Sequence, residues 1–526
     1  MTRAAIVVGS GPNGLAAAIR LAESEYGVTV LEAADGPGGA VRTEELTLPG
    51  FRHDTFSSVY PAAVASPVFE RMALERHGLR WIHPAACYAH PLPGGEAIAL
   101  YRDVDATAAS LDARHAGDGG RWRAFVSPLV DEFAALRATM LGGFPPVGGA
   151  LKLVGALGVP GAVRFGALVP GSARALARRL FESGDARAWL YGAAGHGDAL
   201  PTAPGSAIAA AYLNLMGHAV GWPSPEGGAQ RLTDALVAHL EELGGRVRTG
   251  ALVTRVTAAG GRVTGVEVAG GERLAADVIV ADVMPHALAD LAGDALPALY
   301  RRLLRRYRYG TATLKVDWAL DGPIPWTSPV VAGAGTVHVG GGEDELLATM
   351  RESTGGLPER PFLLVGQQTV ADPSRAPAGK HTAWAYTHGP QRGVDWAAEL
   401  DRHVERVERQ LERYAPGFGD RILARHVLGP ADLERRNRNL VGGDVGGGSY
   451  RLDQVVFRPV PSPSPYRTPL DGLYLGSAAA FPGGAAHGVP GDAAARAALA
   501  DQGPVRRSLR GARRRVLNRR AATPAR

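Results

Sequence analysis

The first thirty residues alternate apolar runs and turns in the order strand, turn, helix, strand. Ala4–Val8 is a short apolar run rich in β-branched residues, and the loop Gly9–Gly14 follows it directly. Leu15–Ala22 has the composition and spacing of a helix, and Gly27–Glu32 is a second strand-like run that ends in an acid. This succession is the context that a dinucleotide-binding loop requires.

The middle of the chain has a helical pattern instead. From about Arg71 to Pro225, amphipathic and apolar segments are interrupted by proline and glycine. Ala138–Ala177 consists of apolar blocks separated by single cations. It predicts either surface helices packed on a sheet, or a lid or membrane-facing lip over an apolar pocket. Ala207–Met216 is densely apolar but too short to span a membrane, which indicates a buried helix.

Strands return after the amphipathic helix predicted at Gln230–Leu243. The strand-like runs that follow are Arg246–Thr249, Leu252–Thr257, Val263–Val268 and Asp277–Ala281. Further on, a strand at Thr311–Leu320 and a helix at Trp396–Tyr414 indicate a mixed substrate domain. A last strand, Gly472–Leu475, precedes a helix at Asp492–Asp501. This order predicts that the chain returns to its first sheet twice.

The predicted fold is therefore α/β. It has a discontinuous, Rossmann-like dinucleotide domain, a mixed α/β substrate domain and a helical cap. The predicted segments are the first part of the dinucleotide domain (1–70), a mainly helical cap or substrate region (71–225), the second part of the dinucleotide domain (226–284), the substrate domain (285–465), the third part of the dinucleotide domain (466–502) and a basic disordered tail (503–526).

Composition and charge exclude several classes of protein. The chain of 526 residues is 46% hydrophobic and 21% charged, as in ordinary globular proteins. Its formal charge of +6 arises from the segment Val505–Arg526, which holds nine arginines and no acid. Such a tail is usually solvated. We therefore predict no specific nucleic-acid recognition, with weak attraction of the tail to anionic lipid or nucleic acid as the alternative.

Cysteine usage and the start of the chain limit the redox chemistry and the location. Cys87 is the single cysteine, so an internal disulfide, a CxxC redox pair and a cysteine-based zinc site are excluded. The first strand begins at Ala4, which leaves no room for a targeting peptide. We predict a cytoplasmic protein, with peripheral contact to a membrane as the alternative.

The loop Gly9–Gly14 has glycine where a dinucleotide fold requires it. Gly9 permits the tight turn, Gly11 lets the backbone approach a pyrophosphate, and Gly14 lets the helix pack on the strand. The predicted site also includes Pro12 and Asn13 of the same loop. The free N–H groups at the start of the helix favour phosphate.

The acid at the end of the second strand indicates which dinucleotide binds. Glu32 accepts hydrogen bonds from a ribose diol and repels a 2′-phosphate, so FAD or NAD fits and NADP does not. Ala33 follows it and is assigned to the same site. A second glycine turn at Gly38 and Gly39, with Arg42 close behind, can meet the same pyrophosphate and favours FAD.

Several motifs together resemble a known family. They are GSGPNGLAAAIRLA, EAADGPGGAVRT, PEGG at Pro225 and GLYLGSAAAFPGGAAHGVPG near the C-terminus. The chain resembles the phytoene dehydrogenase-related flavoproteins, within the glutathione-reductase-like superfamily that includes amine oxidases and carotenoid desaturases. The branch that it resembles most is that of pyridine nucleotide-disulfide oxidoreductase domain-containing protein 2.

The resemblance implies further cofactor contacts. Val253 matches the position whose backbone contacts the adenine, and Gly476 matches the glycine that ends the last strand beside the pyrophosphate. Val489 and Pro490 match residues that lie against the flavin, at the N-terminus of the final helix. Partial positive charge there favours the anionic reduced flavin.

The resemblance also singles out two candidate catalytic residues. Lys315 lies in GTATLKVDWALDGPIPW, which resembles the amine oxidase segment whose lysine holds a water at flavin N5; the alternative is a strand lysine that reaches solvent or pairs with Asp317. His487 stands where a small residue is common, and predicts either a proton donor or acceptor near the flavin or a histidine bound to backbone. No spacing predicts a metal site.

The expected activity is FAD-dependent oxidoreduction, of the dehydrogenase, desaturase or oxidase type. A hydride would pass from a small hydrophobic organic substrate to flavin N5, while the protein positions the substrate and tunes the flavin. The alternatives are a redox-neutral flavin-dependent isomerase and a flavin-binding regulatory protein with little turnover. The sequence predicts no particular oligomeric state.

Overall fold

A parallel sheet of five strands assembles from three distant segments of the chain. The computed structural model describes residues 3–502, and the predicted tail 503–526 lies outside this range. In sheet order the strands are β19 (Leu473–Leu475), β13 (Val278–Ala281), β1 (Ala4–Val8), β2 (Gly27–Leu31) and β9 (Arg246–Arg248). All four pairings are parallel. The α/β, Rossmann-like fold predicted from the sequence is confirmed.

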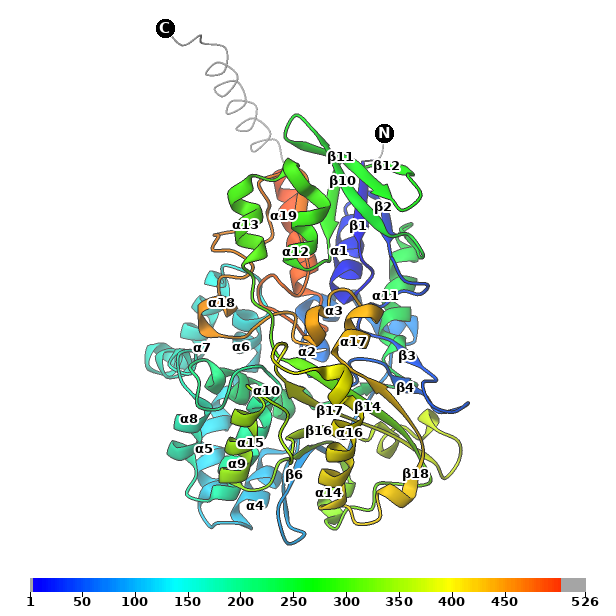
Figure 1. The fold of residues 1–526 in the computed structure, drawn as a ribbon. Coiled ribbons are helices and arrows are strands. Elements are labelled where there is room, and N and C mark those ends of the chain that lie inside the picture. Colours follow the sequence, from blue (N-terminus) through cyan, green and yellow to red (C-terminus); the bar gives the residue numbers. More distant parts are fainter. Residues whose placement is uncertain (1–2, 503–526) are drawn as a thin grey trace.

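Helices from the two ends of the chain pack together on this sheet. α1 (Pro12–Ala22) and α19 (Val489–Asp501) contact each other along their length, and α11 (Gln230–Glu242) packs beside α1 (Figure 1). The contact between α1 and α19 is so close that a Cβ on Gly491 would overlap the carbonyl oxygen of Asn13. Alanine dominates the buried face of both helices, which permits this approach.

A small antiparallel sheet and two helices complete this end of the molecule. The sheet consists of β10 (Val253–Ala259), β11 (Arg262–Val268) and β12 (Arg273–Ala275). The helices are α12 (Pro285–Ala292) and α13 (Ala298–Arg305). Their apolar side chains share a core with β1, β13 and β19. The sequence indicated β10 and β11, whereas β12 is too short to be recognised by its pattern.

The second large sheet has seven strands. In order they are β18 (Ile422–Leu428), β14 (Ala312–Leu320), β17 (His381–Gly389), β16 (Leu363–Gly366), β15 (Ala334–Val339), β6 (Ala86–Pro91) and β7 (Ala97–Leu100). β6 pairs with β15 in parallel and all other neighbours are antiparallel. The sequence pattern did not indicate β6 and β7, which come from the region predicted as mainly helical.

The two faces of this sheet differ because side chains alternate along each strand. On β14, Leu314, Val316 and Trp318 join the apolar core beneath α16 (Trp396–Glu412). Lys315 and Asp317 lie on the opposite face. That face is turned toward the dinucleotide domain, because Asp317 approaches His53 of β4 (His53–Asp54).

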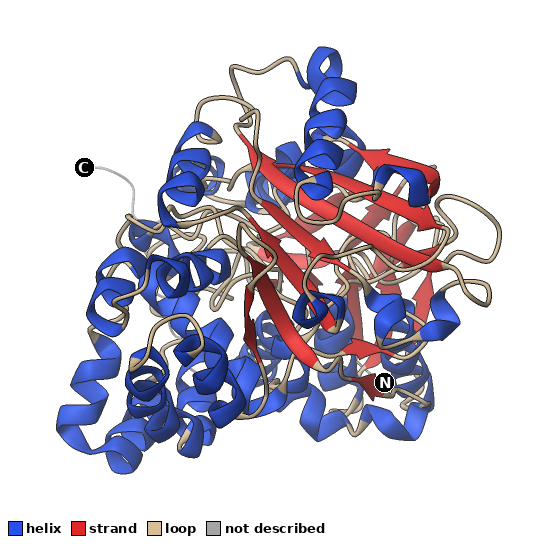
Figure 2. Cartoon of the chain, turned by 90° about the horizontal axis from the view of Figure 1, so that it is seen from below, coloured by secondary structure: helices blue, strands red, loops and turns tan. Residues whose placement is uncertain are grey.

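The cap is a group of helices beside this sheet. Its helices are α4 (Val104–Asp112), α5 (Asp118–Asp131), α6 (Phe133–Met140), α7 (Val147–Gly166), α8 (Ala173–Leu180), α9 (Gly184–Ala194) and α10 (Ser206–Val220). They gather on one side of the strands (Figure 2). α10 is largely buried, as its apolar composition predicted.

α7 is unlike the other cap helices, because its apolar residues face outward. It packs chiefly on α6, and Leu151 and Val163 are 69% and 65% exposed. Among residues 3–502 it is the one helix long and apolar enough by composition to cross a bilayer, and 11% of that window is buried. This half of the predicted Ala138–Ala177 segment therefore does not pack on a sheet.

Short elements join the parallel-sheet domain, the seven-stranded sheet and the helical cap. They are β3 (Thr43–Glu44), α2 (Pro61–Val64), α3 (Pro67–Met72), η1 (Leu74–His77), β5 (Trp81–Ile82), β8 (Ser224–Pro225), η2 (Gly293–Ala295), α14 (Pro329–Ala332), α15 (Glu343–Glu352), η3 (Gln368–Val370), η4 (Pro373–Arg375), η5 (Gly419–Arg421), α17 (Pro430–Arg436), η6 (Val441–Gly443) and α18 (Leu452–Val455).

Candidate functional site

The loop between β1 and α1 requires each of its three glycines. Gly9 has a φ of 97°, which side chains rarely adopt, and a Cβ on Gly14 would overlap the carbonyl oxygen of Gly9. A Cβ on Gly11 would lie 2.8 Å from Oδ2 of Asp282. Gly11 begins α1 without a side-chain cap. The loop is thus a bare backbone turn at a helix N-terminus, as anion binding requires.

The second glycine turn lies directly on the first. Gly38 and Gly39 have φ values of 121° and 56°, and a Cβ on Gly39 would lie 3.1 Å from Cα of Gly11. The N–H of Gly38 donates to the carbonyl oxygen of Ser10 at 3.2 Å. The structure therefore brings together the two loops that the sequence assigned to one pyrophosphate. Arg42, assigned to the same group, lies 3.3 Å from Glu44.

Glu32 stands beside the first loop. Its carboxylate accepts hydrogen bonds from the N–H and the hydroxyl of Ser10, at 2.9 and 2.6 Å, and from the N–H of Ala34 at 2.9 Å. Its own carbonyl oxygen accepts from Ala251, two residues before Val253. Val253 is buried at the start of β10. The residues assigned to ribose and adenine therefore lie at one edge of the parallel sheet.

The C-terminal glycine segment closes the same site. The N–H of Gly476 donates to the carbonyl oxygen of Ala281 at 3.0 Å. A Cβ on Gly476 would lie 2.9 Å from the Val280 side chain and 3.1 Å from Cα of Gly491. Val489 and Pro490 are buried in the first turn of α19. Residues from both ends of the chain therefore meet beside the glycine loop.

Asn13 carries a buried polar atom that a bound cofactor could pair with. Its side-chain oxygen is buried without a hydrogen-bond partner among the described residues. Bare glycine backbone at a helix N-terminus fits the phosphates of a cofactor, and the unpaired oxygen of Asn13, an acceptor, fits a hydrogen-bond donor elsewhere on the same molecule. The loop and its surroundings therefore fit FAD.

Asp282 lies beside the glycine loop and is not among the residues predicted from the sequence. It follows β13, and its carboxylate accepts a hydrogen bond of 2.9 Å from the N–H of Gly14. Burial raises the pKa of Asp282 to about 7, with the charge of Glu32 adding to the shift and the Gly14 N–H opposing it. The signal was its place directly after a predicted strand, at the edge where ligands of such sheets bind.

His487 is bound to the backbone around α19. Its Nδ1 accepts from the N–H of Val489 at 3.2 Å, and its carbonyl oxygen accepts from the hydroxyl of Ser66 at 2.6 Å. Burial lowers the pKa of His487 to about 4, so its imidazole is neutral at neutral pH. These contacts match the second of the two roles that the sequence left open, a loop histidine that stabilises a turn.

Lys315 pairs with a carboxylate in the interior. Its Nζ lies 2.5 Å from both side-chain oxygens of Asp317, and both side chains are buried. The Nζ also lies 5.9 Å from the ring centroid of Trp384. Burial raises the pKa of Asp317 to about 6, and the charge of Lys315 opposes that shift. The pairing is one of the alternatives that the sequence offered.

The sheet face that carries Lys315 also carries polar aromatic groups without partners. Opposite β14, Trp384, Tyr386 and His388 point to this face because they pair with Asp317, Lys315 and Thr313. Among the described residues, Nε1 of Trp384 and Nε2 of His388 are buried without hydrogen bonds. A water molecule or a bound ligand can complete the contacts of buried polar groups of this kind.

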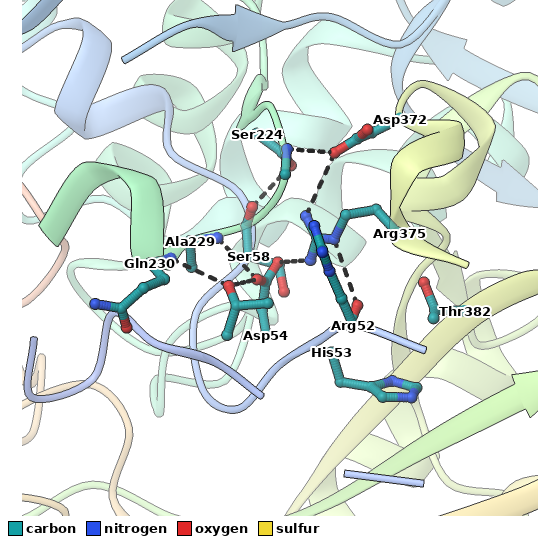
Figure 3. A network of polar contacts seen from close by, with 12 residues as sticks. Arg52, His53, Asp54, Ser58, Ser224, Ala229, Gln230, Asp372, Arg375 and Thr382 are labelled. Carbon is teal, nitrogen blue, oxygen red and sulfur yellow. Dashed lines mark hydrogen bonds and ion pairs between the residues drawn. The ribbon is translucent and has the colours of Figure 1, made fainter. Parts of the chain in front are cut away.

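A buried ion pair connects η4 to the dinucleotide domain. Oδ2 of Asp54 lies 2.6 Å from a guanidinium nitrogen of Arg375, and both side chains are almost wholly buried. Oδ1 of Asp54 accepts from the N–H of Ala229, before α11, at 2.8 Å (Figure 3). Asp372 accepts from the N–H of Gly227 at 2.8 Å. Asp372 therefore holds the PEGG motif at Pro225, and Asp54 holds the residue that follows it.

Two family models match the sequence. Residues 7–75 match an NAD(P)-binding Rossmann-like domain, and residues 161–499 match the flavin-containing amine oxidoreductases. Pyridine nucleotide-disulfide oxidoreductase domain-containing protein 2 of Rattus norvegicus is 29% identical, over 94% of this chain and 93% of that protein. A neurosporene-forming phytoene desaturase of Rhodobacter capsulatus is 27% identical, over 92% and 91%.

Solved structures share the fold. An oxidoreductase of Methanosarcina mazei superposes with a TM-score of 0.64 and 17% identity, over 94% of this chain and 99% of that one. Putrescine oxidase bound to putrescine superposes with a TM-score of 0.59 and 17% identity, over 95% and 98%. The arrangement of a parallel sheet, a large antiparallel sheet and a helical cap is thus common to these proteins.

Proposed function

The chain belongs to the flavin-containing amine oxidoreductases and is an FAD-dependent oxidoreductase, and from this premise we propose that it oxidises a hydrophobic organic substrate. The substrate would transfer a hydride from a carbon or an amine to N5 of the flavin. Bound FAD supplies the electron acceptor for that step. The residues of the chain bind the cofactor, orient the substrate and exclude water.

The residues predicted from the sequence would hold the cofactor. The loops at Gly11 and Gly39 would hold the pyrophosphate, Glu32 the ribose, and Val253 the adenine. The first turn of α19, at Val489 and Pro490, would lie against the flavin. The antiparallel strands β10–β12 between β9 and β13, together with the discontinuous parallel sheet, support a glutathione-reductase-like domain.

One observation carries the proposed substrate class. The face of the seven-stranded sheet that holds Lys315 and Asp317 also carries two large aromatic side chains, Trp384 and Tyr386, which stack with ring centroids 5.9 Å apart. Pockets of this composition favour apolar ligands with few polar groups. One relative is named a neurosporene-forming phytoene desaturase, and this name agrees with a polyene or lipid substrate.

The exposed helix α7 supports access from an apolar phase. Its outward residues include Val147, Leu151 and Val163. A helix in the cap that presents apolar side chains to solvent can lie in the interface of a bilayer. We propose that it makes peripheral contact with a membrane and lets a hydrophobic substrate enter without crossing water.

Lys315 would act at the reacting end of that substrate. A cation next to the flavin can orient water and stabilise negative charge that develops on the reduced cofactor. Asp317 would fix the position of Nζ, because both of its oxygens contact that atom at 2.5 Å.

The test is anaerobic mixing of the purified flavoprotein with a polyene, a fatty-acyl compound and a small amine. We expect bleaching of the flavin absorbance by a hydrophobic compound and recovery of the absorbance with oxygen or a quinone. Bleaching by a small polar amine alone would contradict the substrate class. Turnover that requires reduced flavin but gives no net oxidation of the substrate would instead indicate an isomerase. If no compound bleaches the flavin, the protein does not oxidise substrates of these classes.

A further inference from the structure

Two imidazoles and one carboxylate converge at the side of the dinucleotide domain. His77 ends η1, and His239 and Glu242 lie on one face of α11, three residues apart. Nε2 of His77 lies 3.3 Å from Nδ1 of His239 and 3.3 Å from Oε2 of Glu242, and the last two atoms are 3.5 Å apart. The three atoms form a nearly equilateral triangle.

The size of this triangle matches one coordination geometry. Zinc binds imidazole nitrogen and carboxylate oxygen at about 2.0–2.1 Å in a tetrahedron, which places neighbouring ligand atoms about 3.3–3.4 Å apart. An octahedral ion at the same bond length would need ligand atoms about 3.0 Å apart. The observed separations of 3.3, 3.3 and 3.5 Å fit the tetrahedron.

We propose that His77, His239 and Glu242 bind one zinc ion. Two nitrogen ligands and one carboxylate suit zinc and exclude magnesium and calcium, which prefer oxygen ligands. His77 also lines a surface cavity of about 360 Å³ together with Arg80 and Asp234. A water molecule from this cavity would complete the tetrahedron. The site requires neither the flavin nor the proposed substrate.

The ion would join two segments that are far apart in sequence. His77 and His239 are separated by 162 residues. η1 follows the first segment of the dinucleotide domain, and α11 begins the second and packs beside α1. Zinc would stabilise the fold by its binding free energy, because the three ligands come together in the folded chain and not in the unfolded one. The zinc would therefore hold η1 and α11 together.

The alternative is a metal-free contact. One imidazole nitrogen can donate to the other at 3.3 Å, with Glu242 as a solvent-exposed partner whose side chain is 56% exposed. This contact needs no ion and would be insensitive to chelators. Metal binding measured directly separates the two cases.

The experiment uses the FAD-loaded protein after treatment with a chelator. We expect titration with zinc sulfate to give one tight site per chain by calorimetry, and a raised thermal midpoint. Glu242→Gln, on an exposed side chain that can change without unfolding the protein, should weaken zinc binding at least tenfold, and His77→Ala at least as much. His381→Ala, on a histidine at the start of β17, serves as the matched control and should leave the affinity unchanged.

Cobalt tests the geometry. Co(II) in place of zinc should give the intense visible absorption of a tetrahedral site, and Glu242→Gln should reduce it. The proposal is overturned by no stoichiometric zinc binding, by equal binding in all three variants, or by a weak octahedral cobalt spectrum. Flavin content, measured in parallel, should stay the same in every variant.

Discussion

The carboxylate of Asp282 accepts a hydrogen bond of 2.9 Å from the N–H of Gly14, across 268 residues of sequence. The contact fixes the start of α1 against the end of β13. It also places an acid next to the loop that we propose as the pyrophosphate site. Whether that acid carries a charge should therefore affect cofactor binding.

The affinity for FAD should fall as the pH rises through about 7. Asp282 has a pKa of about 7 in the folded protein, against 3.8 ordinarily. Above pH 7 its negative charge opposes the pyrophosphate, so we expect the FAD dissociation constant to rise about tenfold between about pH 6 and 8. Fluorescence titration of the cofactor-free protein with FAD measures this dissociation constant. Asp282→Asn keeps an acceptor for Gly14 and should remove the pH dependence; an unchanged slope would refute the assignment.

The same group makes the cofactor-free protein less stable toward neutral pH. The unfolded chain releases the Asp282 proton near its ordinary pKa of 3.8, while the folded chain keeps it to about 7. The folded state therefore binds more protons in this interval, and this contribution to stability falls as pH rises from about 4 to about 7. Asp282→Asn should flatten that part of the curve of thermal midpoint against pH.

Replacing Gly11 with leucine should abolish FAD retention. A Cβ alone would lie 2.8 Å from Oδ2 of Asp282, and the rest of the side chain would occupy the turn where backbone must approach the pyrophosphate. The visible spectrum of the purified variant should lack flavin bands. Gly120→Ala in α5, where an added Cβ meets nothing within 4 Å, is the control and should keep its flavin.

Lys315→Met should slow the flavin reaction about a hundredfold, a magnitude typical of losing one acid–base group. The change also leaves Asp317 buried without its partner, which costs about 3–5 kcal/mol. The double variant Lys315→Met/Asp317→Asn removes that unpaired charge. We expect stopped-flow traces to be slow in both variants and only the single variant to lose stability. Fast traces in the stable double variant would show that Lys315 is structural.

Breaking the Asp54–Arg375 pair should destabilise the protein by about 3–5 kcal/mol, because it leaves a buried carboxylate without an opposite charge. Arg375→Met is the variant, and thermal unfolding followed by circular dichroism is the measurement. Arg409→Met, which removes a surface contact to Glu359, should change the midpoint little. Equal effects of the two variants would mean that solvent reaches the Asp54 pair.

The sequence predicted the local parts of the site and missed the parts that depend on topology. Gly9, Gly11 and Gly14 are recognisable because their spacing and the flanking strand and helix lie within one short segment. Asp282 joins them only because β13 pairs with β1, a fact that residue spacing does not contain. The pair of Asp54 and Arg375 was not predictable for the same reason, because the two residues come together only in the folded chain.

The seven-stranded sheet shows a second limit. β6 and β7 lie in a region dominated by helices, and their pairing with each other and with β15 identifies them as strands. The partner of Lys315, by contrast, was predictable. Residues two apart on a strand share a face, and Asp317 is the neighbouring acid.

The close contact between Asn13 and Gly491 has a consequence for the order of events during synthesis. The glycine loop leaves the ribosome first, but the helix that packs on it and the turn that would face the flavin emerge only when most of the chain has been made. A nascent chain therefore holds an incomplete site. We expect cofactor loading to follow the synthesis of α19, and a chain truncated before Gly491 to accumulate as an unloaded, aggregation-prone protein.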